Sequence, residues 1–375
     1  MNQRFTLDGS EALEHHLSDL CSKICTRVQD LIPSSQLDGI VLGGGYGRGE
    51  GGVLRTENGD LPYNDLEFFV FVRGVLGEIH FADSLHALGH ELSEGAGVEI
   101  EFKVMTLAKL RHAAPSMFYY DLVTGHRWIV GDDSLFEGCE HHRDASCIPL
   151  HEATRLLMNR CSGLLYAKER LLRAEFTDAD ADFVARNIAK AQLALGDVVL
   201  AVHGRYHWSC RERGHRLLGL DTTLAGVEQL RAFHAEGIQF KLHPQQSRES
   251  RAVLLARHGQ VAALAQHLWL WLEARRLKHS FDSPASYALS DESKCPEQPF
   301  WKNLAVNLRA FGPRLAFTRS ALRYPRERLL RALPLLLWGV TSIAEQAMVR
   351  SCLQCDALNL SDAVSAYSKL WQRFN

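Results

Sequence analysis

Two acidic side chains in one short apolar run are the residues of this chain best suited to bind a metal ion. The run reads Asp65-Leu66-Glu67-Phe68-Phe69-Val70, and its apolar and aromatic content predicts a β-strand. Because successive side chains of a strand point to opposite faces, Asp65 and Glu67 are expected on the same face. Two carboxylates there would supply the hard oxygen ligands that Mg²⁺ prefers.

A glycine-rich segment precedes that strand. It reads Leu42-Gly43-Gly44-Gly45-Tyr46-Gly47-Arg48-Gly49-Glu50. Because glycine has no side chain, the backbone N–H groups of such a segment can approach a bulky anion closely. A phosphate cradle beside paired carboxylates is the arrangement that a metal-dependent nucleotide enzyme needs.

A third carboxylate would complete a two-metal site, and the next predicted strand, Gly97 to Met105, offers two. We choose Glu101, with Glu99 as the alternative, because both are expected on one face and the sequence does not set the register between strands. The predicted catalytic acids and metal ligands are therefore Asp65, Glu67 and Glu101. Two unit charges about 4 Å apart interact by about 4 kcal/mol at a dielectric near 20. Because about 1.4 kcal/mol corresponds to a tenfold change in rate, Asp65→Asn is expected to lower the reaction rate at least about 100-fold.

Two other interpretations of these residues must be weighed. Acids two apart on a strand commonly form a solvated face, with Leu66 and Phe68 pointing inward. The segment Gly47-Arg48-Gly49-Glu50-Gly51-Gly52 also matches the GxGxxG pattern of dinucleotide-binding folds. That fold requires a long helix directly after the glycines, whereas residues 53–62 contain a turn signal, Glu57-Asn58-Gly59-Asp60, and cannot form one.

The surrounding elements predict an α+β fold with two domains. In the first domain, residues 1–148, the expected elements are helices over 9–32 and 81–94 and strands over 39–42, 66–72, 97–105 and 128–131. In the second domain, residues 149–375, the expected helices are 150–174, 179–204, 249–279, 300–311, 326–350 and 360–374. Pro334 is expected to kink or split the fifth of these helices. The second domain is expected to be all-helical and to bind the acceptor of the reaction.

Composition limits the class of protein. The 375 residues carry a formal net charge of −2 and no long basic tract, which argues against a stably bound nucleic acid. The chain has no apolar segment long enough to span a bilayer, and its nine cysteines are irregularly spaced. We therefore expect a cytoplasmic protein with reduced thiols and no membrane partner.

The glycines and the acids together resemble the nucleotidyltransferase superfamily that includes DNA polymerase β. The local sequence is closest to small-molecule members of the kanamycin nucleotidyltransferase type. A Gly-Ser-x-Gly-Arg stretch there corresponds to Gly44-Gly45-Tyr46-Gly47-Arg48, and Pro-Tyr-Ser-Asp-Ile-Glu corresponds to Pro62-Tyr63-Asn64-Asp65-Leu66-Glu67. The match covers about 90 residues. Two departures are Gly45, which stands where a phosphate-binding serine is common, and a longer loop that predicts an inserted hairpin at Glu50 to Asp60.

The resemblance implies an activity and a set of ligands. Gly44, Gly45 and Arg48 would hold the triphosphate of a nucleotide, most simply ATP, and Mg²⁺ or alternatively Mn²⁺ would bind the acids. Lys190, on the predicted helix over 179–204, would also face phosphate, although a solvated helix face is the plainer interpretation. The expected reaction transfers a nucleoside monophosphate to a hydroxyl of a small molecule or protein and releases pyrophosphate. The alternatives are an inactive nucleotide-binding or interaction protein of the same fold, and polynucleotide extension or cyclic oligonucleotide synthesis.

Overall fold

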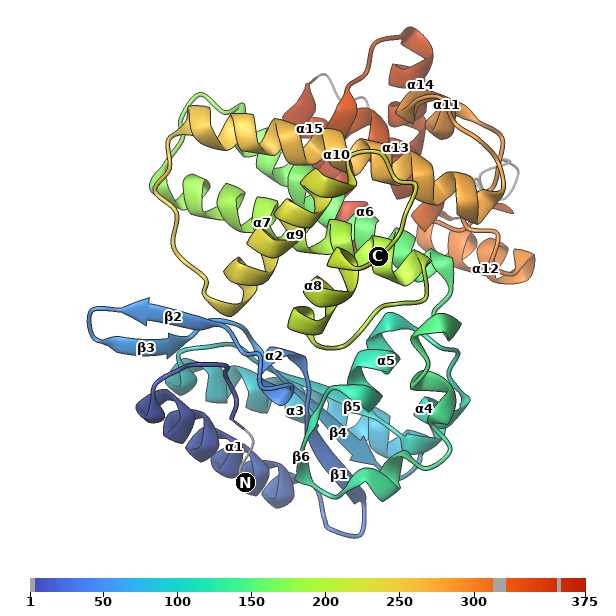
Figure 1. Ribbon diagram of the computed structural model, residues 1–375. Coiled ribbons are helices and arrows are strands. Elements are labelled where there is room, and N and C mark those ends of the chain that lie inside the picture. Colours follow the sequence, from blue (N-terminus) through green and yellow to red (C-terminus); the bar gives the residue numbers. More distant parts are fainter. Residues whose placement is uncertain (1–3, 313–321, 356–358) are drawn as a thin grey trace. The chain divides into compact units, whose positions relative to one another are not determined.

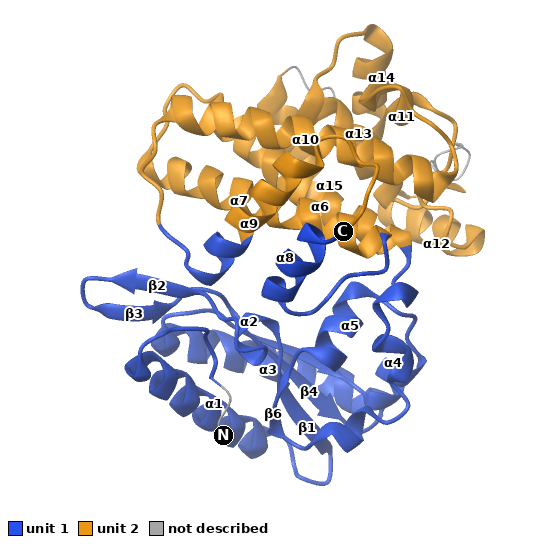
Figure 2. Cartoon of the chain, viewed as in Figure 1, with its two compact units in different colours: residues 1–149, 203–219, 238–245 blue, residues 150–202, 220–237, 246–375 orange. Residues whose placement is uncertain are grey.

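The protein has an α+β fold made of two compact units (Figure 2). The computed structural model describes residues 4–312, 322–355 and 359–375. Unit 1 comprises residues 1–149, 203–219 and 238–245, and unit 2 comprises residues 150–202, 220–237 and 246–375. Among the described residues, no helix combines the length and the apolar character needed to cross a membrane.

Unit 1 is built on a mixed sheet of four strands in the order β5-β4-β1-β6 (Figure 1). Its strands are β1 (Leu37–Leu42), β4 (Leu66–Val72), β5 (Ile100–Met105) and β6 (Arg127–Val130), and its hairpin strands are β2 (Val53–Thr56) and β3 (Gly59–Pro62). Its helices are α1 (Glu11–Leu31), α2 (Gly44–Gly47), α3 (Gly74–Ala96), α4 (Leu107–His112), α5 (Met117–Thr124) and α8 (Cys210–Leu218). The β2–β3 hairpin confirms the predicted hairpin between the glycines and the acids, although it spans residues 53–62 and not 50–60.

The two faces of the sheet are covered differently, and this positions the acids. Leu66, Phe68 and Val70 of β4 belong to one apolar cluster with residues of α1 and α3. Phe69 and Phe71 belong to a second cluster with residues of α4 and α5. By the alternation of the strand, Glu67 lies on the same face as Phe69, at the beginning of β4. The acids are therefore at the margin of the face that α4 and α5 cover.

The pairing of β4 with β5 brings the two acidic strands together. These strands are parallel and are joined through α3, and Glu67 pairs with Glu101 while Phe69 pairs with Lys103. The strand β5 begins at Ile100, three residues later than predicted, and α3 begins at Gly74, seven residues earlier than predicted. The alternation predicted for β5 is confirmed, because Glu101 and Lys103 share one face.

Unit 2 is all-helical. Its helices are α6 (Leu150–Leu171), α7 (Asp178–Val202), α9 (Val227–Leu242, whose last residues belong to unit 1), α10 (Arg251–Leu277), α11 (Pro284–Leu289), α12 (Phe300–Phe311), α13 (Arg326–Trp338), α14 (Ile343–Leu353) and α15 (Leu360–Phe374). The predicted split at Pro334 is wrong, because α13 continues through Pro334, and the predicted kink stays a prediction. The helix ends instead at Gly339, whose φ of 111° no helix can continue.

The contiguous domains predicted from the sequence also need correction. The first break falls after Pro149, one residue later than predicted, but two later segments, residues 203–219 and 238–245, return to unit 1. Buried polar contacts explain the first return, since Glu50 accepts hydrogen bonds from Ser209 and from the backbone of Cys210. The ring of Phe240, in the second returning segment, lies edge-on to Tyr63.

Candidate metal and phosphate site

Three carboxylates from β4 and β5 gather at one point of unit 1. Asp65 lies just before β4, Glu67 lies within it, and Glu101 lies beside Glu67 on β5. One ligand oxygen from each of the three lies within 4.8 Å of the others, which is a spacing that a shared metal ion can bridge. The predicted alternative, Glu99, is not part of this group; it lies before β5, and its carbonyl accepts a hydrogen bond from the Leu66 amide.

The electrostatics of this acid triad (Asp65, Glu67 and Glu101) show that it carries excess negative charge. The pKa of Asp65 is raised, first because protein atoms displace water from its carboxyl and then because Glu67 and Glu101 repel its ionised form. A divalent cation would relieve this repulsion. Carboxylate oxygens are also the donor type that Mg²⁺ and Mn²⁺ favour.

Lys103 already provides a positive charge to the acid triad. Its Nζ lies 2.7 Å from Oε1 of Glu67 and 3.7 Å from Oε2 of Glu101. Burial alone would lower the pKa of Lys103, but these two carboxylates outweigh burial and raise it. The ammonium also lies 5.6 Å from the ring centre of Phe69 and 5.5 Å from that of Phe118. Lys103 is thus held between two carboxylates and two aromatic rings.

The glycine turn, residues 43–49, lies directly against Glu67. The Gly43 amide donates to the Glu67 carbonyl at 2.8 Å. Gly44 has a φ of 62°, and a Cβ there would lie 3.0 Å from Oε2 of Glu67. Glycine is therefore favoured at position 44 by both its backbone conformation and its close approach to the acid. The turn and the acid triad form one continuous site.

Two backbone amides of the turn have no partner within the described part of the chain. Gly44 and Gly45 begin the single-turn helix α2, where the first N–H groups have no carbonyl to bind. Packing also explains the departure at Gly45. A Cβ at position 45 would lie 3.0 Å from the Glu50 carbonyl, so a serine would press on the backbone that closes the turn.

Arg48 is used within the fold. Its Nη2 pairs with Asp121 of α5 at 2.9 Å, and its Nη1 donates to the Trp208 carbonyl at 3.0 Å. The side chain is only 10% exposed. Tyr206 also donates to the same oxygen of Asp121, and Arg213 donates to the Tyr206 hydroxyl. Arg48 therefore anchors the base of the glycine turn, and its predicted contact with phosphate stays a prediction.

Lys190 lies in the other unit. It is an exposed residue of α7, in the all-helical unit 2. The structure therefore brings together Gly44, Gly45, Asp65, Glu67 and Glu101, all of unit 1. The proposed contact between Lys190 and phosphate stays a prediction.

The alternation of the predicted strand places Lys103 on the face of Glu101, but its ion pairs with the acids were not predicted. Two further residues of this region were not predicted at all. Glu50, which is 5% exposed, ties the glycine turn to the N-terminus of α8. Burial lowers the pKa of Lys241, near Glu50, Arg48 and Arg213, and nothing in the local sequence indicated it.

Comparison with known proteins adds no relative. No protein-family description matches the chain, and no curated protein matches it. The geometry of unit 1 therefore carries the functional argument.

Proposed function

We propose that this protein is a Mg²⁺-dependent nucleotidyltransferase. It would transfer a nucleoside monophosphate from a nucleoside triphosphate, with ATP the expected donor, to a hydroxyl group and release pyrophosphate. The observation that carries the proposal is the convergence of the acid triad, with ligand oxygens within 4.8 Å, and the glycine turn at Gly44. This is the pairing of a cation site and a phosphate site that phosphoryl-group transfer needs.

The residues present fit a divalent cation. Three carboxylates offer only hard oxygen donors, and the pKa of Asp65 is raised in part by its acidic neighbours. The Lys103 ammonium occupies the position of a cation between two of the acids. Asp65, Glu67 and Glu101 would hold Mg²⁺, or Mn²⁺ in its place. When bound, the metal would neutralise charge on the phosphates and orient them for in-line displacement.

The glycine turn has a complementary role. The amides of Gly44 and Gly45 would donate to phosphate oxygens, and the absence of side chains would let the triphosphate lie against the backbone. Arg48 and Glu50 would keep the turn in place through their buried contacts within unit 1. The acceptor would be a hydroxyl of a small molecule or of a protein side chain.

A second function is favoured by two specific features. Lys103 already neutralises part of the acid triad, and Gly45 offers no hydroxyl to phosphate. Both features would suit a protein that binds nucleotide without turning it over. In that case triphosphate would bind at the glycine turn, and the ion pairs of Lys103 would persist.

Pyrophosphate release distinguishes the two functions. The protein is incubated with each labelled triphosphate, Mg²⁺ or Mn²⁺, and a fractionated cell extract as the source of acceptors. The variants are Asp65→Asn, Glu67→Gln and Glu101→Gln, and Glu99→Gln is the matched control from the same strand region. Transfer that falls at least about 100-fold in the three variants and persists in the control supports the enzyme.

Other outcomes contradict the enzymatic function. Saturable triphosphate binding with no product under any acceptor condition would favour the nucleotide-binding protein. Equal loss in Glu99→Gln and Glu101→Gln would show that the acid triad is wrongly assigned. If the protein neither binds nor transfers any triphosphate, both proposed functions are wrong.

A further inference from the structure

A second charged cluster lies in unit 2, around the helix α13. Glu327, Arg328 and Arg331 of this helix are 2%, 8% and 6% exposed. Removing a charge from water is expensive unless the charge is paired and hydrogen-bonded. Each of these buried charges should therefore have a complete set of partners, and a buried charge without one indicates a place for a ligand.

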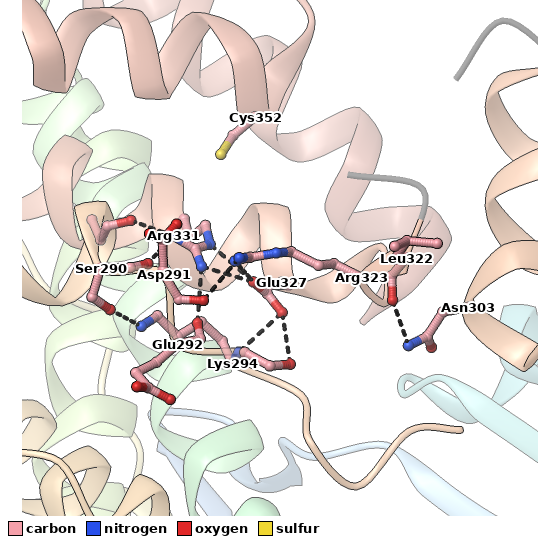
Figure 3. A network of polar contacts seen from close by, with 12 residues as sticks. Ser290, Asp291, Glu292, Lys294, Asn303, Leu322, Arg323, Glu327, Arg331 and Cys352 are labelled. Atoms are coloured by element: carbon pink, nitrogen blue, oxygen red, sulfur yellow. Dashed lines mark hydrogen bonds and ion pairs between the residues drawn. The ribbon is translucent and has the colours of Figure 1, made fainter. Parts of the chain in front are cut away.

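Glu327 has such a set. Its Oε1 accepts from Arg331 at 2.9 Å and from Arg323 at 2.6 Å. Its Oε2 accepts from the backbone amide of Lys294 at 2.9 Å. Figure 3 shows Arg331 and Arg323 converging on this single carboxylate. One negative charge thus faces two guanidinium groups.

Arg331 is also fully engaged. Its Nη1 donates to the carbonyl of Ala288. Its Nη1 also donates to the carbonyl of Ser290, and its Nη2 donates to that of Glu292 (Figure 3). Arg323 uses its second terminal nitrogen on the Asp291 carbonyl. These two arginines hold the segment between α11 and α12 against α13.

Arg328 is the exception. Its Nη1 donates to the carbonyls of Ser351 and Cys352, at 3.2 and 3.4 Å, where α14 ends. Its Nη2 is shielded from solvent and makes no hydrogen bond to any residue that the structure describes. Within the same residues it has no carboxylate partner, and burial lowers its pKa. The ring of Phe311, whose centre lies 4.8 Å from the Arg328 Cζ, offsets part of the cost of burial, but the unused donor still favours an anion.

A pocket of about 190 Å³ lies at this arginine, inside unit 2. Arg323, Arg328 and Arg331 contribute to its lining together with Glu327 and Asp291, which leaves a formal charge of +1. Leu289, Met348 and Cys352 form an apolar part of the same lining. The lining of the pocket is therefore part charged and part apolar.

We infer that this pocket of unit 2 binds a small organic anion, with its oxyanion on Arg328 and its apolar group against Leu289 and Met348. Planar guanidinium groups bind carboxylate and phosphate oxygens equally well in geometry, so either oxyanion fits. The site is independent of the acid triad, which belongs to unit 1. It would therefore bind a regulatory or substrate anion whether or not the protein transfers nucleotides.

Calorimetric titration of the full-length protein with benzoate, phenyl phosphate and inorganic phosphate tests the inference. Hydrogen exchange of residues 322–331 and 346–353 reports binding at this pocket and separates it from phosphate bound at the glycine turn. Arg328→Met removes the cation, and Arg328→Lys keeps a donor for the Ser351 carbonyl while removing the unused nitrogen. Lys168→Met is the control, because Lys168 likewise donates to two helix carbonyls, those of Leu336 and Leu337, and does not line the pocket.

The expected result is saturable binding of benzoate or phenyl phosphate that protects these residues from exchange. We expect this binding to weaken by about 10-fold or more in both Arg328 variants and to remain in Lys168→Met. Preference between benzoate and phenyl phosphate identifies the oxyanion. Equal binding in the wild type and Arg328→Lys, equal loss in Lys168→Met, or no binding of any probe at about 10 mM would overturn the inference.

Discussion

Replacing Lys103 with methionine is expected to tighten the binding of a divalent cation to the acid triad. The Lys103 ammonium lies 2.7 Å from Glu67 and 3.7 Å from Glu101, so a metal ion that uses these carboxylates must compete with it. Methionine preserves an unbranched apolar stem beside the rings of Phe69 and Phe118. The substitution therefore removes the charge and keeps most of the packing.

The size of the effect follows from the two distances. In bulk water the 2.7 Å and 3.7 Å separations correspond to about 1.5 and about 1.1 kcal/mol of attraction. Lys103 is 33% exposed and Glu101 is 41% exposed, so solvent and salt reduce these values. Exposed pairs measured in other proteins contribute roughly 0.2–1 kcal/mol each. Two such pairs correspond to about 2- to 30-fold tighter binding of the cation.

Titration of the metal-free protein with Mn²⁺, followed by the electron paramagnetic resonance of free Mn²⁺, measures this change. Calorimetry with Mg²⁺ is the second measurement. Lys109→Met is the matched control, because Lys109 pairs with Glu78 on the surface of the same unit and away from the acid triad. The control is expected to bind Mn²⁺ as the wild type does.

Unchanged or weaker Mn²⁺ binding in Lys103→Met would refute this reasoning, because it would show that the ammonium does not compete for the carboxylates. The same increase in Lys109→Met would show that only the overall charge matters. Normal Mn²⁺ binding by a Glu67→Gln variant would show that the acid triad is not the metal site.

Three further predictions concern stability, each measured by thermal unfolding of the metal-free protein. Asp65→Asn should raise the melting temperature at pH 7, by about 1–3 °C, because ionising a carboxyl whose pKa is raised costs folding free energy above that pKa; an unchanged or lower temperature would contradict this. Glu50→Gln should cost about 1–3 kcal/mol at pH 7, because its hydrogen bonds to Ser209 and Cys210 overcome burial and lower its pKa. This difference in stability between the wild type and Glu50→Gln should be fully present above pH 4.5, the ordinary pKa of a glutamate, and should shrink as the pH falls through the lowered pKa. A stability difference that persists in acid would contradict this prediction. Gly44→Ala should lower the melting temperature more than Gly74→Ala, because both have positive φ but only Gly44 approaches Glu67, and equal losses would exclude that contact.

The parts of the site that the sequence predicted are those governed by local geometry. The strand over 66–72 and the hairpin before it follow from residue type and turn signals, and the pleat alone places Asp65 and Glu67 on one face. The same pleat places Glu101 beside Lys103. The choice between Glu101 and Glu99 needed the pairing of two strands separated by a helix of 23 residues, which packing decides.

The sequence by itself determined an α+β protein whose glycine turn is followed by a hairpin and an acidic strand, because short-range periodicity and turn chemistry act within a few residues. Only the tertiary structure decided that Glu67 pairs with Glu101 across the two strands. It likewise decided that Lys103 forms ion pairs with the acid triad and that Asp121 forms an ion pair with Arg48. It also decided that residues 203–219 return to unit 1. These outcomes depend on contacts between distant segments, and their free energy comes from burial and charge pairing that no local pattern encodes.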